Sequence, residues 1–418
     1  MRSIVAILIS TALAVLSAGN AFALDADQIE RWKEDLEVYH DTLRERHIDL
    51  YHSVSRDRFE DELDSLIDAL PSLREHQVIF ELMRITRLIG DGHTQLPIMA
   101  GPHTHYPLRF RLFGGDVRLI AAAAEYKAHL GSSVVAIGGI PIAEVLSTLS
   151  PAVQGVENEY SLLSSLAFHL TVDNMLYAAG ITANPGSADF SFENDAGVVT
   201  TTTVVSVPMR EFTQRTRHRI ETVTNFGDPL IEVSDGLWLA LSKTTESAYL
   251  YFAGYPSFDD MVEFAQRVRE QLEKERIRNI IVDFRDNGGG DFYNGLALSH
   301  AILMTESIDW NHGVYVLIGR DTISAAMSNA VQFRQILNAR LVGEPTGSNP
   351  VGYQELGRFH LPHSNRMVFH SKRLYRFQDT ATSGVQPDVQ IETDADAFVA
   401  GIDQALEWII EDIRTRAQ

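Results

Sequence analysis

The feature that most constrains the fold is an alternation of strand and helix patterns after Trp238. Residues 277–284 form an apolar run typical of a strand buried on both faces, and residues 314–318 form a second one. An amphipathic helix pattern precedes the first run, and helix patterns at 293–304 and from Ser324 onward follow the two runs. Such an alternation implies right-handed crossovers, so the sequence predicts an α/β domain with a mainly parallel sheet.

The rest of the chain carries other patterns. Apolar positions between 25 and 89 recur in three helical stripes, and this part ends at the glycine-containing motif 90–93, which leaves His93 on a loop. Short alternating and β-branched runs between 106 and 207 predict a mainly β region. The apolar spacing from 398 to 409 predicts one helix near the end of the chain.

The composition is that of a globular protein with several modules. The chain has 418 residues, of which 45% are hydrophobic and 22% charged, and these fractions exclude large-scale disorder. The formal net charge of -21 repels phosphate backbones and anionic lipid headgroups, so we expect neither a nucleic-acid partner nor a membrane-surface partner. The sequence contains no cysteine, which excludes a cysteine nucleophile, disulfides and thiolate metal sites.

The N-terminus has the organisation of an export signal. Arg2 is followed by an apolar run at 4–16 and by the small-x-small cleavage pattern of residues 21–23. The run is too short to cross a bilayer comfortably, although an uncleaved anchor is an alternative. We therefore predict cleavage near Ala23, a mature chain that begins at Leu24, and a periplasmic or secreted protein without stable membrane insertion.

A buried strand runs directly into consecutive glycines in the segment 280–290. Glycines at such a place let the backbone approach a ligand closely and expose N–H groups as donors. A tight strand-to-helix turn capped by Asn287 is the structural alternative. A phosphate-binding P-loop is rejected, because no Lys-Ser/Thr pair follows the glycines.

Ser324 and His93 are the candidate nucleophile and base. Ser324 lies between an apolar strand and a helix, where the positive end of the helix dipole favours an alkoxide and the Ala325 N–H can face an oxyanion. Serine and threonine are also preferred helix N-caps, so Thr322 or Ser324 could act only as a cap. His93 titrates near neutrality and can accept a serine proton, whereas Asp91 and His93 alone are too few ligands for a metal site.

Together these motifs resemble those of the C-terminal processing peptidases, a superfamily that includes the tricorn protease core and the interphotoreceptor retinoid-binding proteins. The motifs occur in the expected order at 283–289, 322–326, 343–347 and 384–388. The helical N-terminal part, which ends in the motif 90–94, resembles the tricorn-like branch. The resemblance extends over essentially the whole mature chain.

The resemblance implies a crotonase-like α/β catalytic domain. It also implies a serine nucleophile at Ser324 and an oxyanion hole formed by the backbone of Gly288 and Gly289 and by the N–H of Ala325. Peptide or protein substrates follow from the family, and no cofactor or metal is implied.

The sequence departs from the family at several positions. Asn349 stands where the Ser/Lys branch has its lysine, so the histidine branch, with His93 as base, is the natural interpretation. The tricorn-like proteases have a serine before that histidine, and this chain has Gly92. Glu355 and Asp379 are the two candidates for the acid that orients His93, and we favour Glu355.

We predict four segments from these features: a signal peptide (1–23), an N-terminal helical module (24–100), a β-rich and possibly PDZ-like middle region (101–235), and a crotonase-like catalytic domain (236–418). The predicted function is that of an exported serine-type peptidase that forms an acyl-enzyme on Ser324. The middle region, with its turn at 138–141, is expected to bind peptide as an added strand. A non-catalytic binder of apolar ligands and a small-ester or lactone hydrolase are the alternatives, and the oligomeric state is left open.

Overall fold

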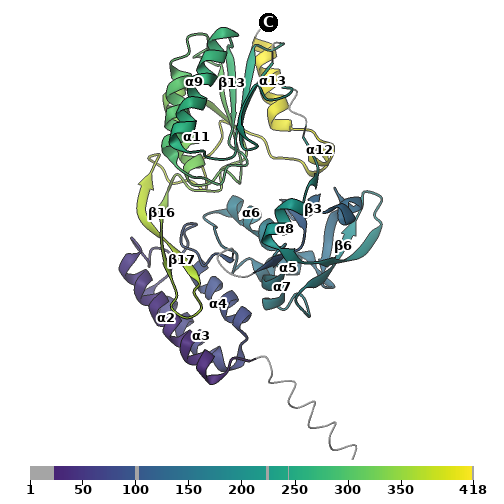
Figure 1. Cartoon of the computed structure of the whole chain (residues 1–418), viewed down its shortest axis with the longest axis vertical. Coiled ribbons are helices and arrows are strands. Elements are labelled where there is room, and N and C mark those ends of the chain that lie inside the picture. Colours follow the sequence, from purple (N-terminus) through teal and green to yellow (C-terminus); the bar gives the residue numbers. More distant parts are fainter. Residues whose placement is uncertain (1–22, 99–102, 223–225, 243, 417–418) are drawn as a thin grey trace, which may run out of the picture.

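A computed structural model of the chain describes residues 23–98, 103–222, 226–242 and 244–416. The predicted signal peptide lies outside these residues, except for Ala23. Within the described ranges, every helix is too short or too polar to span a bilayer. The structure is a mixed α/β protein with several sheets (Figure 1).

The N-terminal part is helical, as its apolar stripes predicted. Its elements are α2 (Ala26–Arg46), α3 (Arg56–Ala69), the 3-10 turn η1 (Leu70–Ser72) and α4 (Glu75–Arg87). Asp25 begins α2 with a capping box in which its carboxylate accepts from the Gln28 N–H. After α4 the chain turns through Gly90, whose φ of +86° is a conformation that favours glycine, and this turn leads directly to His93.

The middle part is built on an antiparallel sheet with the order β2-β3-β4-β6-β7, which confirms the predicted β character. Its strands are β2 (Leu108–Phe113), β3 (Asp116–Ala122), β4 (Ser133–Ile137), β5 (Ile140–Pro141), β6 (Ser187–Glu193), β7 (Val199–Val205) and β9 (His218–Arg219), with β1 (Thr104–His105) and β8 (Val207–Pro208) as a separate pair. Its helices are η3 (Ala124–His129), α5 (Ile142–Leu149), α6 (Glu159–His169), α7 (Asp173–Ala178) and α8 (Met209–Arg215). Of these helices, the sequence patterns predicted only α5.

The last part contains a seven-stranded sheet with the order β10-β11-β12-β13-β14-β15-β18. Its strands are β10 (Ile231–Ser234), β11 (Leu237–Ser242), β12 (Ser247–Phe252), β13 (Asn279–Asp283), β14 (Val314–Ile318), β15 (Arg340–Gly343) and β18 (Val389–Gln390). The pairs from β12 to β18 are parallel, which confirms the predicted mainly parallel core.

Helices cover both faces of this sheet. They are α9 (Phe258–Lys274), α10 (Phe292–Leu303), α11 (Ala325–Leu337) and α13 (Gln404–Arg416), whereas the short helix α12 (Ala395–Val399) contacts β2 and β3 of the middle part. Figure 1 shows α9 and α11 on one face and α13 on the other, and a separate apolar cluster fills each face. The prediction of one terminal helix from 398 to 409 is wrong. The helical conformation is interrupted between α12 and α13 at Gly401, where φ is +78°.

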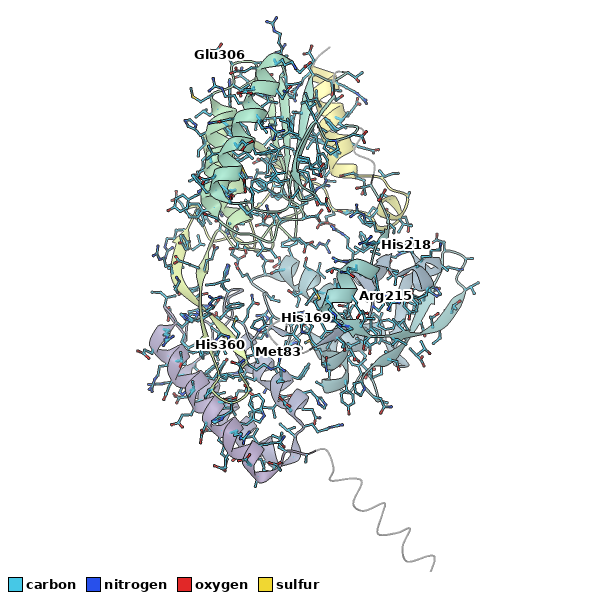
Figure 2. All side chains as sticks on the ribbon, viewed as in Figure 1. Met83, His169, Arg215, His218, Glu306 and His360 are labelled. Atoms are coloured by element: carbon cyan, nitrogen blue, oxygen red, sulfur yellow. The ribbon has the colours of Figure 1, made fainter. Side chains whose placement is uncertain are left out.

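A long hairpin connects the last part to the N-terminal helices. It consists of β16 (Val351–His360) and β17 (Met367–Arg376), which pair in antiparallel fashion. Figures 1 and 2 show the hairpin reaching down beside α2, with His360 at its far end. Phe369 of the hairpin and Gln95 exchange two backbone hydrogen bonds of 3.2 and 2.8 Å. The hairpin therefore fixes the segment that follows His93.

Candidate active site

Ser324 lies in a strained turn between β14 and α11. Its φ of 54° and ψ of -120° are unusual for a residue with a side chain, and strain of this kind costs roughly 1–3 kcal/mol. Neighbouring contacts hold the turn: the Thr322 hydroxyl donates to the Phe284 carbonyl, and the Ser324 N–H donates to Ser348 Oγ at 2.9 Å. The Ser324 side chain makes no capping hydrogen bond, so the interpretation of Ser324 as a simple N-cap is wrong.

His93 lies within hydrogen-bond distance of this serine. The distance from His93 Nε2 to Ser324 Oγ is 3.0 Å, although the two residues are far apart in the sequence. His93 is 6% exposed, so the imidazole is largely shielded from water. The structure thus brings the two predicted residues together in the geometry of a base and a nucleophile.

Asp91 fixes the loop that carries His93. Its Oδ1 accepts hydrogen bonds from the backbone N–H groups of His93 and Thr94 and from the Ser371 hydroxyl, and its Oδ2 lies 3.0 Å from His47 Nε2. Burial alone would raise the pKa of Asp91, but the hydrogen bonds from His47, Ser371 and Thr94 together lower it. Asp91 is therefore a buried, ionised anchor for the His93 loop.

His47, His52 and Asp91 place three potential ligand atoms within 4.8 Å of one another. However, His47 Nδ1 accepts a hydrogen bond from the Asp49 N–H at 3.0 Å, so the ring proton belongs on Nε2, where it is donated to Asp91. A metal ion at Nε2 would have to displace that proton. The arrangement favours a hydrogen-bonded histidine–carboxylate pair over a metal site.

The carboxylate that faces His93 is Glu157, from the loop before α6. Glu157 Oε1 lies 3.4 Å from His93 Nδ1, and both side chains are buried. This separation is longer than a good hydrogen bond, and His93 Nδ1 has no hydrogen-bond partner in the described structure. Catalytic hydrogen bonds are often long in ligand-free enzymes and tighten when substrate binds, so the contact is of the kind that orients a base.

Ser348 surrounds Glu157 together with Asn349 and Gly92, two positions at which the sequence departs from the family pattern. Ser348 Oγ donates to Glu157 Oε1 at 3.0 Å, and the Asn349 N–H donates to Glu157 Oε2 at 2.7 Å. A Cβ atom at Gly92 would lie only 2.6 Å from Glu157 Cγ. Glu157 therefore occupies space that a serine at position 92 would fill, and the backbone N–H of Asn349 binds the carboxylate.

The two acids that sequence reasoning favoured lie elsewhere. Glu355, on β16, pairs with Lys372 at 2.8 Å and Arg373 at 2.9 Å, and Asp379 is exposed after β17. The expectation that Glu355 faces His93 is corrected by this placement, because strand β16 directs its carboxylate to the cations of β17. Sequence reasoning missed Glu157, which carries no motif of its own.

The predicted oxyanion donors are adjacent to Ser324. Gly289 has a φ of +99°, and a Cβ atom there would lie 2.8 Å from Ser324 Cβ and 3.3 Å from Ala325 N. The Gly289 N–H already donates to Asn287 Oδ1 at 2.9 Å. The amides of Gly288 and Ala325 are therefore better candidates for an oxyanion hole than that of Gly289.

A cavity of about 550 Å³ borders the site. Gly288 and Ile323 line one side of it, and residues of β2 and α6, including Arg109 and Leu163, line the opposite side. Arg320 connects the two sides of the cavity. Its guanidinium donates to the Leu112 carbonyl of β2 and forms a bidentate pair with Glu344 in the last part of the chain. The cavity thus lies between the middle and last parts of the chain.

No protein-family model matches the chain. The structure of mature CPAF complexed with lactacystin has a TM-score of 0.65 at 11% identity, over 93% of this chain and 98% of that one. Mature CPAF has a TM-score of 0.64 at 11% identity, over 93% and 97%. The photosystem II D1 C-terminal processing protease has a TM-score of 0.42 at 16% identity, over 90% and 98%. At these identities the likeness to mature CPAF shows that the chain shares the fold of that protein.

Proposed function

We propose that the chain is an exported serine-type peptidase in which Ser324 is the nucleophile and His93 the general base. The observation that carries this proposal is the 3.0 Å contact between His93 Nε2 and the hydroxyl of a serine in a strained turn. Backbone strain concentrates at functional sites. A carrier of apolar ligands would gain nothing from a strained serine that contacts a buried histidine, so the catalytic proposal is favoured.

The first half of the reaction forms an acyl-enzyme. His93 Nε2 takes the proton from Ser324 Oγ as the oxygen attacks the carbonyl carbon of a peptide bond, and Glu157 beside Nδ1 stabilises the imidazolium that forms. The negative charge on the carbonyl oxygen is received by the amides of Gly288 and Ala325. His93 then gives its proton to the leaving amine as the C–N bond breaks.

The second half regenerates the enzyme. A water molecule gives a proton to His93 Nε2 and attacks the acyl carbon, and the oxyanion again lies against the same two amides. Collapse of this intermediate breaks the bond to Ser324 Oγ, which recovers its proton from His93. The products are a carboxylic acid and the amine released in the first half.

The cavity beside Gly288 and Ile323 is the proposed place for the peptide. It is larger than a single side chain requires, and Leu163 and Phe212 contribute apolar walls. The turn at 138–141, where strand addition was expected, does not line this cavity. We therefore propose binding along the β2 side of the middle region. The PDZ-like and crotonase-like assignments, with boundaries at residues 100 and 235, remain part of this proposal.

The proposal is tested by labelling residues 24–418 with a fluorophosphonate, which reacts with an activated serine by forming a P–O bond and releasing fluoride. We expect labelling of the wild type and none of Ser324→Ala, with strong loss in His93→Ala. Ser187→Ala and His300→Ala, which replace an exposed serine and an exposed histidine, are the matched controls. Absence of labelling in a correctly folded wild type would contradict the proposal.

Labelling alone does not distinguish a peptidase from an esterase, because both need the same nucleophile. Hydrolysis of a peptide library and of a small activated ester by the same preparation separates the two. A peptidase cleaves library members at a rate that depends on their sequence. Ester hydrolysis without any peptide cleavage would favour the alternative of a small-ester or lactone hydrolase.

A further inference from the structure

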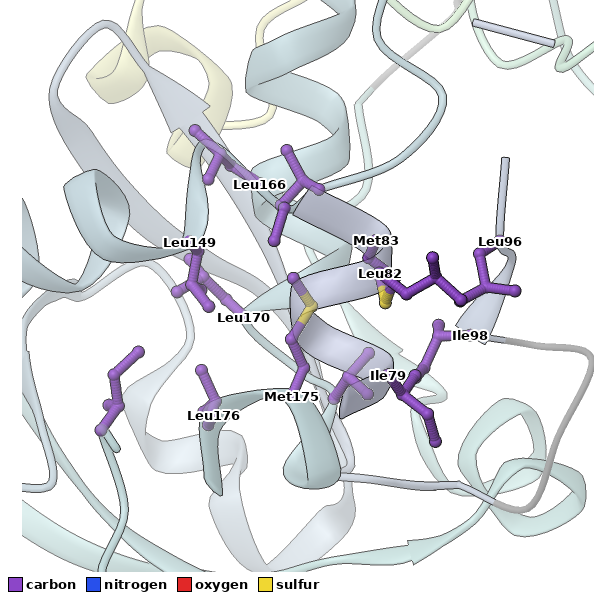
Figure 3. Packing of buried hydrophobic residues seen from close by; sticks show 14 of the residues in the cluster. Ile79, Leu82, Met83, Leu96, Ile98, Leu149, Leu166, Leu170, Met175 and Leu176 are labelled. Carbon is purple, nitrogen blue, oxygen red and sulfur yellow. The ribbon is translucent and has the colours of Figure 1, made fainter. Parts of the chain in front are cut away.

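A second cavity lies away from Ser324, between α4, α7 and the tip of the β16–β17 hairpin. Its volume is about 310 Å³, at the lower end of the roughly 300–1,000 Å³ of ligand pockets. Apolar side chains form its walls, and they are Ile79, Phe80, Met83, Ile98, Met175 and Ala178. Figure 3 shows Ile79, Met83, Ile98 and Met175 close together. The walls suit an aliphatic chain of limited length.

Two polar side chains that line this cavity carry buried atoms without partners. In the described structure, Arg366 Nη1 and His76 Nε2 make no hydrogen bond, and Arg366 is 8% exposed. A buried polar atom without a partner is energetically costly, and more so when the group is charged. Such groups in an apolar cavity indicate a ligand that supplies hydrogen-bond acceptors.

The charges around the cavity favour an anionic ligand. Burial lowers the pKa of Arg366, and the field of Glu75 raises it only in part. Glu75 is exposed at the cavity and makes no ion pair with Arg366, so water screens its charge. Burial lowers the pKa of the His76 imidazole, and the positive charge of the neighbouring Arg74 lowers it further. The buried charge in the lining of the cavity is therefore the positive charge of Arg366.

We propose that this cavity binds a small amphiphilic carboxylate, such as a medium-chain fatty acid. The carboxylate accepts hydrogen bonds from Arg366 Nη1 and His76 Nε2, and the alkyl chain lies against Met83, Met175 and Ala178. The site shares no lining residue with the cavity beside Ser324, so it does not depend on the proposed peptidase function.

The proposal is tested by calorimetric titration of residues 24–418 with octanoate, 1-octanol and octylamine at neutral pH. We expect saturable binding of one octanoate, and affinity at least about tenfold lower for 1-octanol and octylamine, which lack the carboxylate. Arg366→Gln should weaken octanoate binding at least about tenfold. Ala178→Leu, which fills part of the cavity with an apolar group, should weaken all three ligands.

Arg358→Gln is the matched control, because Arg358 is exposed on the same hairpin and does not line the cavity. Thermal melting of each variant verifies that it is folded. The titration is repeated with Ser324→Ala, which should bind octanoate as the wild type does, so that failure of the peptidase proposal leaves this result intact. Absence of saturable octanoate binding, or full affinity in Arg366→Gln, would overturn the proposal.

Discussion

Glu157 Oε1 lies 3.4 Å from His93 Nδ1, while Ser324 Oγ lies 3.0 Å from the other imidazole nitrogen. The three side chains come from the middle, N-terminal and last parts of the chain, so the site exists only when all three parts are docked. A carboxylate beside Nδ1 favours the tautomer with its proton on that atom, and Nε2 is then free to accept the serine proton. The order serine, histidine, acid is that of a catalytic triad.

Replacing Glu157 by glutamine should reduce the rate of fluorophosphonate labelling by on the order of 10⁴-fold, the loss seen when a triad carboxylate is neutralised. Glutamine has the size of glutamate, its carbonyl oxygen can accept from the Asn349 N–H, and its NH₂ group can donate to the Ser348 hydroxyl, so the fold should persist. The measurement is the second-order labelling rate, with circular dichroism as a check of folding.

Glu355→Gln is the control for that experiment, since Glu355 pairs with Lys372 and Arg373 on the hairpin. Its labelling rate should stay within about twofold of the wild type, because an exposed ion pair contributes little. An equal loss of labelling rate in Glu157→Gln and Glu355→Gln would show that Glu355, the acid on the hairpin, also contributes to the reactivity of the serine.

Gly92→Ala should disturb the site by a steric route. The added Cβ would lie 2.6 Å from Glu157 Cγ and 2.8 Å from its Oε1, so the carboxylate must move away from His93. We expect a labelling rate at least about tenfold lower and a loss of about 1–3 kcal/mol in the free energy of unfolding. Gly115→Ala, at an open position in a hairpin turn, is the control.

A double-mutant cycle identifies the cause of the Gly92 effect. In a Glu157→Ala background the clash is absent, so Gly92→Ala should no longer lower the free energy of unfolding. Additive losses in the two variants would mean that Gly92 matters for another reason, such as the path of the loop.

Much of the last part of the chain could be predicted from the sequence. The apolar runs of β13 and β14 are buried on both faces, and this burial is what makes such strands recognisable. Ser324 and His93 could be named because each lies in a motif. Helix α6 was missed because apolar residues such as Leu162, Leu163 and Phe168 are distributed around it, so no single stripe forms.

The acid of the site could not be predicted from the sequence. Glu157 has neither a motif nor a fixed spacing from His93, and only tertiary packing brings the loop before α6 against the segment after β15. The one available signal was the departure of two residues from the family pattern. Gly92 and Asn349 differ from the family pattern, and both contact Glu157 in the structure.

The pair between Glu344 and Arg320 should make stability depend on pH. Burial alone would raise the pKa of Glu344, but the hydrogen bonds and charge of Arg320 lower it from 4.5 to about 2. The folded state therefore binds fewer protons than the unfolded state between these values. The stabilisation is complete above the ordinary pKa and is lost as the pH falls toward 2.

We expect Glu344→Gln to lower the free energy of unfolding by about 3 kcal/mol at pH 7, and the gap to the wild type to shrink as the pH falls from about 5 to about 2. Urea unfolding of both proteins across this range is the measurement. Glu306→Gln, at an exposed acid labelled near the top of Figure 2, should show no such gap. A gap that does not change with pH would contradict the assignment.

Ser348 joins the nucleophile to the acid. Its hydroxyl oxygen accepts from the Ser324 N–H at 2.9 Å, its O–H donates to Glu157 Oε1 at 3.0 Å, and its side chain is fully buried. Ser348→Ala removes both hydrogen bonds, leaves a buried N–H without a partner, and releases the strained turn that holds Ser324. We expect a loss of about 1–3 kcal/mol in stability and a labelling rate at least about tenfold lower.

Ser299→Ala is the matched control, because Ser299 is equally buried but its hydroxyl donates only to the Leu296 carbonyl within α10. If the two variants lose stability alike and Ser348→Ala still labels at the wild-type rate, Ser348 is a structural serine, and the coupling between Ser324 and Glu157 plays no part in the reaction.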